Sequence, residues 1–374
     1  MTRGLHAYAF FQDFVLLYPV YALLFADSGL SEAQISSLFA LWSVTSFTLE
    51  VPSGVLADRV SRRLLLAAAP LLAGAGFALW VLLPSYPAFA VGFVLWGAGG
   101  ALGSGALEAL VYEGLAAAGA AHRYPRLIGR SRAVATAAVV VATPLASPVL
   151  AAGGYAALGA ASVAACVCAA AAGWALPEAP RDRAASDDGD GEAGVLRDAL
   201  AEVRRAPALL GVLALLSVLS GAEALEEYLP LLARSTGVSD TAVPPLVLLV
   251  TAGTAVGQWC AGHATRWAGP ALCAAALLLA VGAFSGHPAG MLGVAAAFGV
   301  LAWAGVAVET RLQERISDRS RATVTSLAGI GTETVGLLFF AVYGLGSVWA
   351  GPGALFAVLA VPFLVVGLLL WRPR

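Results

Sequence analysis

Apolar runs long enough to cross a lipid bilayer follow one another along almost the whole of this sequence of 374 residues. A transmembrane helix needs about 20 apolar residues, because the hydrocarbon core of a bilayer is about 30 Å thick. Inside that core each backbone amide must find its partner within the protein, which favours helices. We predict an all-α membrane protein with twelve spans, near residues 5–26, 34–57, 64–83, 87–115, 127–150, 154–176, 208–230, 243–263, 268–286, 288–310, 322–346 and 352–371.

The composition agrees with this prediction and argues against a soluble protein. Charged residues make up 12% of the chain and the mean hydropathy is +0.84, whereas about 25% of a soluble domain is charged. The spacing of the cysteines matches neither a disulfide framework nor a metal site. We interpret them as small core residues, because all four lie in apolar runs, at Cys166, Cys168, Cys260 and Cys273.

The distribution of arginine predicts the orientation of the spans. All 21 basic residues are arginine. If the N-terminus lies in the cytoplasm, the twelve spans place every arginine except Arg234 on the cytoplasmic side, as the positive-inside rule requires. One missed or extra span would move the later arginines to the wrong side. We therefore predict a multi-pass protein of the cell (plasma) membrane with both termini in the cytoplasm.

A change of composition divides the chain at its midpoint. Residues 177–207 are polar and include an acidic run over 187–192, which is typical of a solvated linker. Within the linker, residues 194–205 have the pattern of a short amphipathic helix. Six predicted spans precede this segment and six follow it. We predict an N-terminal bundle over 1–176, a cytoplasmic linker over 177–207 and a C-terminal bundle over 208–374, the two-half plan of many transporters.

A short charged turn lies between the second and third apolar runs, and residues 54–66 read Gly-Val-Leu-Ala-Asp-Arg-Val-Ser-Arg-Arg-Leu-Leu-Leu. This stretch resembles the loop 2–3 signature of the major facilitator superfamily, here of bacterial drug and small-molecule efflux members. Ser61 stands where the family usually has glycine. The residues that match are Gly54, Leu56, Ala57, Asp58, Arg59, Arg62, Arg63 and Leu66. Residues 177–181 and 312–326 resemble the end of span six and loop 10–11 of the same family.

The resemblance implies two pseudo-symmetric six-helix bundles around a central cavity, and a cytoplasmic gate at loop 2–3. In the family this loop pairs with the opposite half in one state only. We therefore expect a gating role for Gly54, Asp58, Arg59, Arg62 and Arg63. The same network could include Glu108, Glu113, Arg130 and Arg132, although positive-inside anchoring is an equal alternative for the last two.

Two features of efflux members are missing. Span four carries no arginine over residues 96–105, and residues 143–148 supply two prolines without the glycines that drug–proton antiporters often have in span five. Both departures weaken the case for antiport. We interpret the glycine-rich face of span four as a helix-packing surface rather than a phosphate loop, because it is apolar throughout and no lysine follows.

Acidic side chains within the spans are the candidate proton or substrate sites. A carboxyl group in hydrocarbon is costly and therefore needs a partner or a function, and in a low-dielectric cavity it can hold and release a proton near neutral pH. The candidates are Asp13, Glu50, Glu223 and Glu333. The alternative is a hydrogen-bonded acid that never changes its charge. Glu226 and Glu227 follow Glu223, and we favour outer water as their environment.

These features predict secondary active transport of a small molecule by alternating access, with proton-coupled efflux of a neutral or cationic amphipathic compound favoured. A proton-coupled importer and a non-transporting sensor or receptor remain as alternatives. We expect a monomer in the lipid bilayer, driven by the proton gradient, with no cofactor and with neither ATP nor nucleic acid as a partner. We expect no enzyme activity and no catalytic or metal-binding residues, because no nucleophile–base pair or metal-ligand spacing is evident.

Overall fold

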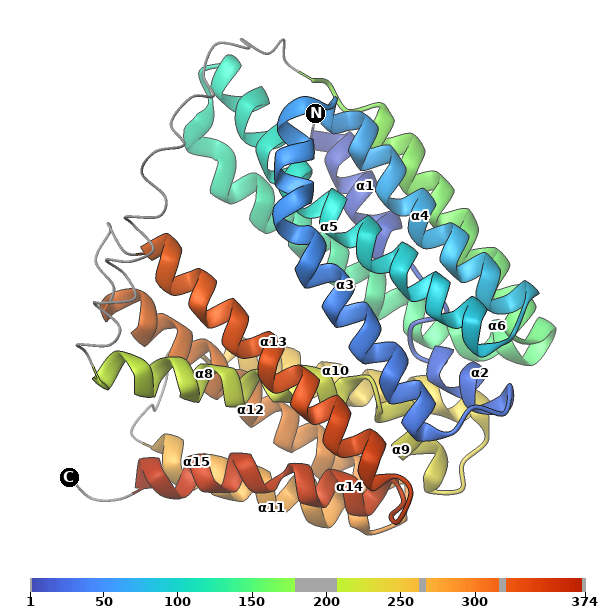
Figure 1. Ribbon diagram of the computed structural model, residues 1–374, viewed down its shortest axis with the longest axis vertical. Helices are drawn as coiled ribbons and strands as arrows, with labels where there is room; N and C mark the ends of the chain where they lie inside the picture. Colours follow the sequence, from blue (N-terminus) through green and yellow to red (C-terminus); the bar gives the residue numbers. More distant parts are fainter. Residues whose placement is uncertain (1, 179–206, 262–266, 316–320, 372–374) are drawn as a thin grey trace. The chain divides into compact units, whose positions relative to one another are not determined.

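The computed structural model describes residues 2–178, 207–261, 267–315 and 321–371 (Figure 1). These residues form helices and turns, with no strand among them. The all-α prediction is therefore confirmed. The predicted amphipathic helix and the acidic run of the linker lie outside the described residues.

The chain divides into two compact units, residues 1–182 with 239–245, and residues 183–238 with 246–374. The helices of the first unit are α1 (Thr2–Asp13), α2 (Tyr21–Asp27), α3 (Glu32–Arg59), α4 (Arg62–Leu82), α5 (Tyr86–Ala117), the short 3₁₀ helix η1 (Ala121–Arg123) and α6 (Tyr124–Trp174). The long helix α6 contains two predicted spans, because Gly154 breaks it with a positive φ of 62°.

The later part of the chain carries the helices of the second unit. They are α8 (Pro207–Glu226), α9 (Leu229–Ser235), α10 (Val243–Trp259), α11 (Ala268–Phe284), α12 (Gly290–Arg315), α13 (Arg321–Gly346), α14 (Pro352–Leu359) and α15 (Val361–Trp371). The 3₁₀ helix η2 (Asp240–Ala242) precedes α10 and, with the first residues of α10, packs with the first unit.

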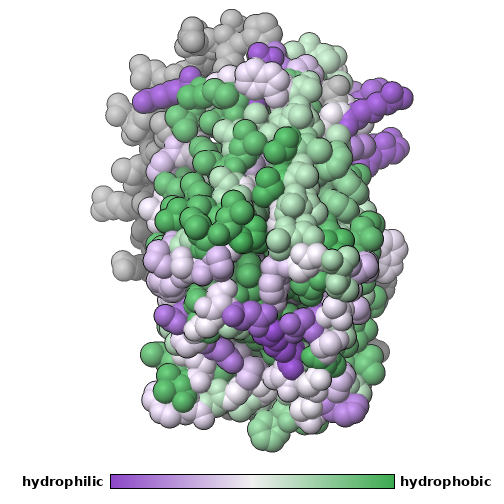
Figure 2. Space-filling view, turned by 90° about the vertical axis from the view of Figure 1, so that its right-hand side faces the viewer, coloured by the Kyte–Doolittle hydropathy of each residue, from purple (hydrophilic) through white to green (hydrophobic). Residues whose placement is uncertain are grey.

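By length and composition, seven helical stretches among the described residues are long and apolar enough to cross a membrane. They are residues 62–82, 86–117, 121–174, 240–259, 290–312, 324–346 and 352–371. Figure 2 shows one face of the molecule on which hydrophobic residues form a broad surface, with hydrophilic residues gathered beyond it. Apolar side chains such as Val141, Leu145 and Val167 are more than two-fifths exposed, as a lipid-facing surface requires.

The first predicted span is broken in its middle, which the apolar pattern did not predict. Helix α1 ends at Asp13 and α2 begins at Tyr21. The intervening backbone is paired in other ways: the N–H of Val20 donates to the carbonyl of Leu17 at 3.0 Å. The N–H of Leu17 donates to the hydroxyl of the buried Ser162 on α6 at 3.2 Å. Backbone at membrane depth is tolerated when protein groups satisfy it in this way.

The seventh predicted span is broken at the corresponding place of the second half. Helix α8 ends at Glu226 and α9 begins at Leu229. The N–H of Tyr228 donates to the carbonyl of Leu225 at 3.1 Å, and the ring of Tyr228 stacks on Tyr343 of α13 with 3.6 Å between centroids. Each half thus begins with a helix that stops at an acidic residue. Such interrupted helices in matching positions are typical of transporter binding sites.

Small residues allow neighbouring helices to approach each other closely. A Cβ atom added at Gly99 of α5 would lie 2.5 Å from the backbone oxygen of Ala69 on α4, and one added at Gly76 would lie 2.7 Å from the oxygen of Gly92. Helices in lipid associate through such close packing rather than through a hydrophobic driving force. The interpretation of the glycine-rich face as a packing surface is confirmed.

Candidate functional site

Three helices of the second unit bring carboxylates together. Glu223 of α8 interacts electrostatically with Glu333 of α13 and with Glu309 of α12, and Glu226 interacts with Glu223. Helix α8 packs against both α12 and α13. Glu223, Glu226 and Glu309 are exposed and Glu333 is half-buried. We call Glu223, Glu226, Glu309 and Glu333 the acidic cluster.

Hydroxyl groups line the contact between α8 and α13 beside these acids. The hydroxyl of Ser220 donates to the hydroxyl of Thr332 at 3.1 Å. Gly331 leaves room for the side chain of Ser217, since a Cβ at residue 331 would collide with its hydroxyl oxygen. The polar seam and the acidic cluster form one hydrophilic region in an otherwise apolar bundle. Like charges close together favour uptake of a proton or a cation there.

Sequence reasoning identified Glu223 and Glu333 but missed Glu309. Glu309 precedes Thr310 and Arg311 near the inner end of its span, so the sequence pattern places it at a helix end rather than among other acids. Only the packing of α8 against α12 brings it into electrostatic range of Glu223.

The acidic candidates of the first unit lie apart from one another. Asp13 is the last residue of α1 and interacts electrostatically with Tyr8 one and a half turns earlier. Tyr8 is 1% exposed, and its hydroxyl has no hydrogen-bond partner among the described residues. Glu50 is exposed on α3, two residues before Pro52. The structure therefore places Asp13 at a helix break and Glu50 on an open helix face.

The predicted gate region is anchored within the first unit through Glu178. Its carboxylate accepts hydrogen bonds from the hydroxyl of Ser61 at 2.5 Å and from the backbone N–H of Arg62 at 2.7 Å. Ser61 is also the N-cap of α4, where its hydroxyl accepts from the N–H of Leu64. The hydroxyl of Ser61, which a glycine would lack, thus bonds to both Glu178 and Leu64.

The two arginines that open α4 have separate partners. The buried guanidinium of Arg62 forms an ion pair with Glu113 of α5, and the guanidinium of Arg63 lies 5.0 Å from the ring centroid of Trp174 on α6. Glu113 is thus an ion-pair partner of the predicted gate residue Arg62. Arg59 and Arg130 are exposed, and Gly54 has open space around its Cα. The side chain of Asp58 lies outside the described residues.

A second ion pair joins the predicted gate residues Arg132 and Glu108 at 3.2 Å. Both side chains are more than half exposed, so the pair contributes at most about 1 kcal/mol. Tyr124 lies nearby at the start of α6. Burial raises the pKa of its phenol, the Glu108 carboxylate raises it further, and Arg132 opposes the change.

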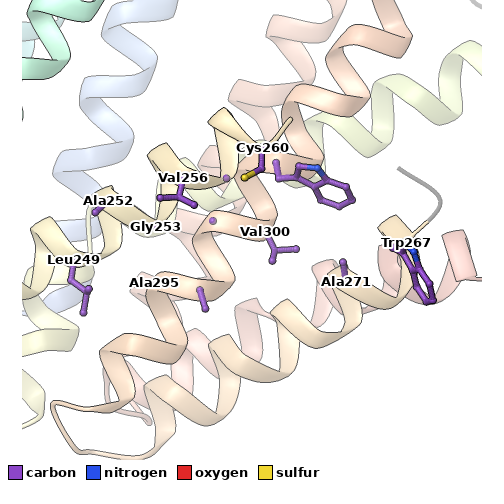
Figure 3. A pocket seen from close by; sticks show the side chains of 13 residues that line it. Leu249, Ala252, Gly253, Val256, Cys260, Trp267, Ala271, Ala295 and Val300 are labelled. Atoms are coloured by element: carbon purple, nitrogen blue, oxygen red, sulfur yellow. The ribbon is translucent and has the colours of Figure 1, made fainter. Parts of the chain in front are cut away.

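An apolar groove of about 620 Å³ lies between α10, α11 and α12 of the second unit (Figure 3). Leu249, Val256, Ala295 and Val300 line it, and Trp267 stands at one end. Its floor is narrow because Gly253 and Gly257 of α10 meet the backbone of α12. None of the predicted site residues lines this groove.

Solved structures that are similar to this chain include several transporters. The chain matches the nucleoside transporter NupG with a TM-score of 0.76 and 14% identity, covering 99% of this chain and 98% of that one. A bacterial homolog of the human lysosomal transporter Spinster, inward-facing and unoccupied, matches with a TM-score of 0.69 and 17% identity over 98% and 91%. A D-xylose–proton symporter matches with a TM-score of 0.63 and 16% identity over 99% and 96%.

At these identities the structures show the fold alone, and no curated protein matches the chain. The family model of the Major Facilitator Superfamily matches residues 6–332. That match covers most of the chain, and the all-α fold agrees with it. The chain is therefore a multi-pass membrane transporter rather than an enzyme, and it belongs to the major facilitator superfamily.

Proposed function

We propose that the protein is a proton-coupled secondary transporter that exports a neutral or cationic amphipathic compound across the plasma membrane. The observation that carries this proposal is the electrostatic interaction of Glu223 with Glu309 and Glu333, which lie on two other helices. Three carboxylates that close cannot all stay ionised at low cost, so binding of a proton or a cationic substrate at one of them is favoured. A competition between proton and substrate for this cluster would couple their movements.

The interrupted helices support the same proposal. Asp13 and Glu226 stand where α1 and α8 stop, so each half has an acid beside non-helical backbone. Rocking of two halves around such a site is the usual mechanism of alternating access. Loop 2–3, held by Glu178 and Glu113, would act as the cytoplasmic gate. We further propose a monomer with both termini in the cytoplasm.

Import by proton symport is the second candidate, because one structural neighbour is a D-xylose–proton symporter. The absence of arginine from residues 96–105 also departs from efflux members. Transport in inverted and right-side-out vesicles separates the two directions. A sensor or receptor would bind its ligand without flux in either orientation.

Proteoliposomes that contain a pH-sensitive dye test the coupling. A panel of neutral and cationic compounds is added to wild type and to Glu223→Gln, Glu333→Gln and Asp13→Asn. The half-buried Asp240→Asn, in η2, is the control. We expect at least one compound to move protons through wild type and the control, and the signal to fall at least tenfold in one or more cluster variants. Flux of a compound without proton movement, in wild type as well as in every variant, would contradict the coupling.

A further inference from the structure

Three aromatic rings from three segments of the first unit are stacked in a row. The indole of Trp96 on α5 stacks on Trp42 of α3, with 5.2 Å between centroids and 28° between planes. The same indole also stacks on Tyr18, which lies in the break between α1 and α2, at 5.4 Å and 21°. We call Trp42, Trp96 and Tyr18 the aromatic stack.

A buried cluster of other rings holds the stack in place. Trp96 also contacts the rings of Tyr21, Phe77, Trp80 and Phe93. Trp80 and Phe93 are fully buried, and the indole N–H of Trp80 donates to the carbonyl of Phe89 at 3.1 Å. Trp96 therefore has little freedom to turn, and the face that it presents to Trp42 is preorganised.

The depth of the two tryptophans is unusual for membrane anchors. Trp42 follows the start of α3 at Glu32 by ten residues, and Trp96 follows the start of α5 at Tyr86 by ten. Ten helical residues rise about 15 Å, which is half of the roughly 30 Å hydrocarbon core. Tryptophans that anchor a protein in the membrane lie at its interfaces instead.

The stack is not fully enclosed. Trp42, Trp96 and Tyr18 are half-buried, unlike the rings behind them. Among the described residues, Trp42 has one aromatic partner, the indole of Trp96. No described ring stacks on the other face of the Trp42 indole. A flat ring laid on that face would extend the stack, and aromatic pairs favour such offset stacking. Asp13 lies five residues before Tyr18 in the same interrupted segment.

We propose that the aromatic stack is a binding platform for a flat aromatic ring of the transported compound, with Trp42 as the contacting residue. This inference rests on the proposed transport function and narrows its substrate class. A positive charge on the ring would add a cation–π attraction to the tryptophan.

Calorimetric titration of purified protein tests the platform without flux or gradient. The probes are ethidium, a planar cation; acridone, a planar uncharged molecule; and tetrabutylammonium, a cation without a ring. We expect at least one planar probe to bind wild type, and Trp42→Leu to weaken it about tenfold. Trp42→Phe keeps an aromatic face and should retain most of the affinity. Trp349→Leu, at an 82% exposed position of the second unit, should not change it.

Two results would overturn the platform. One is that wild type binds neither planar probe, and the other is that Trp42→Leu binds them as tightly as wild type does. Tetrabutylammonium binding should be equal in all variants, which separates stacking from a loss of folding. The titration measures no proton movement, so the platform and the coupling are tested separately. If the protein binds a planar ring but fails the proteoliposome test, the coupling is contradicted and the platform is supported.

Discussion

The side chain of Ser162 accepts a hydrogen bond from the backbone N–H of Leu17 across 145 positions of sequence, at 3.2 Å in a fully buried setting. This bond supports the non-helical backbone between α1 and α2, where Asp13 and Tyr18 lie. A hydroxyl from α6 thus helps to fix the backbone of this segment.

We expect Ser162→Ala to destabilise the protein by about 1–3 kcal/mol, because the N–H of Leu17 would be buried without a partner. Thermal unfolding in detergent measures the loss. Ser162→Thr keeps the hydroxyl and should recover part of the stability. Ser104→Ala is the control, since the exposed Ser104 hydroxyl bonds only within its own helix. Equal melting of Ser162→Ala and wild type would contradict this role.

The carboxylate of Glu178 should stabilise the start of α4. Glu178→Ala removes two hydrogen bonds to a charged acceptor, each contributing about 1.5–3 kcal/mol. Ser61→Gly restores the residue usual in the family but removes only one of the two bonds to Glu178, so we expect a smaller loss. A double-mutant cycle on thermal stability gives the coupling between residues 61 and 178. A coupling energy near zero would show that the hydrogen bond is not formed.

The two ion pairs of the predicted gate region should differ in strength. Arg62 is 8% exposed at its side chain, whereas Arg132 is 76% exposed. We expect Arg62→Ala to cost about 1.5–3 kcal/mol, because it removes the charged hydrogen bond between a buried guanidinium and Glu113, and Arg132→Ala to cost less than about 1 kcal/mol. Denaturation at low and high salt checks both values. Equal losses in the two variants would argue against burial as the cause.

Two adjacent glycines on α5 should respond in opposite ways to the same change. A methyl group at residue 99 would meet the backbone oxygen of Ala69, whereas one at residue 100 would meet nothing within 4 Å. Gly99→Ala should destabilise by about 1–3 kcal/mol through overpacking. Gly100→Ala should be neutral or stabilise by up to about 1 kcal/mol, since alanine favours helices over glycine. Similar melting temperatures for both variants would contradict the close packing of α4 and α5.

Much of the fold could be predicted because it depends on properties local to each segment. The length of an apolar run reports whether a helix can cross the bilayer. Residues 54–66 carry enough of the family pattern to identify the superfamily, which the family model over residues 6–332 shows. The site candidates Glu223 and Glu333 could be identified because a carboxylate within an apolar span is energetically costly and is retained only with a partner or a function.

Tertiary structure decided the features that depend on a partner from elsewhere in the chain. The break after Asp13 needs the hydroxyl of Ser162, and an apolar pattern gives no sign of such a bond. Glu309 joins the acidic cluster only because α12 packs on α8. The stacking of Trp42 on Trp96 likewise brings together residues that are more than 50 positions apart. By itself, the sequence determined the spans and the family, since hydrophobicity is a property of each residue. The contacts around the candidate sites follow from packing between helices, which no single segment encodes.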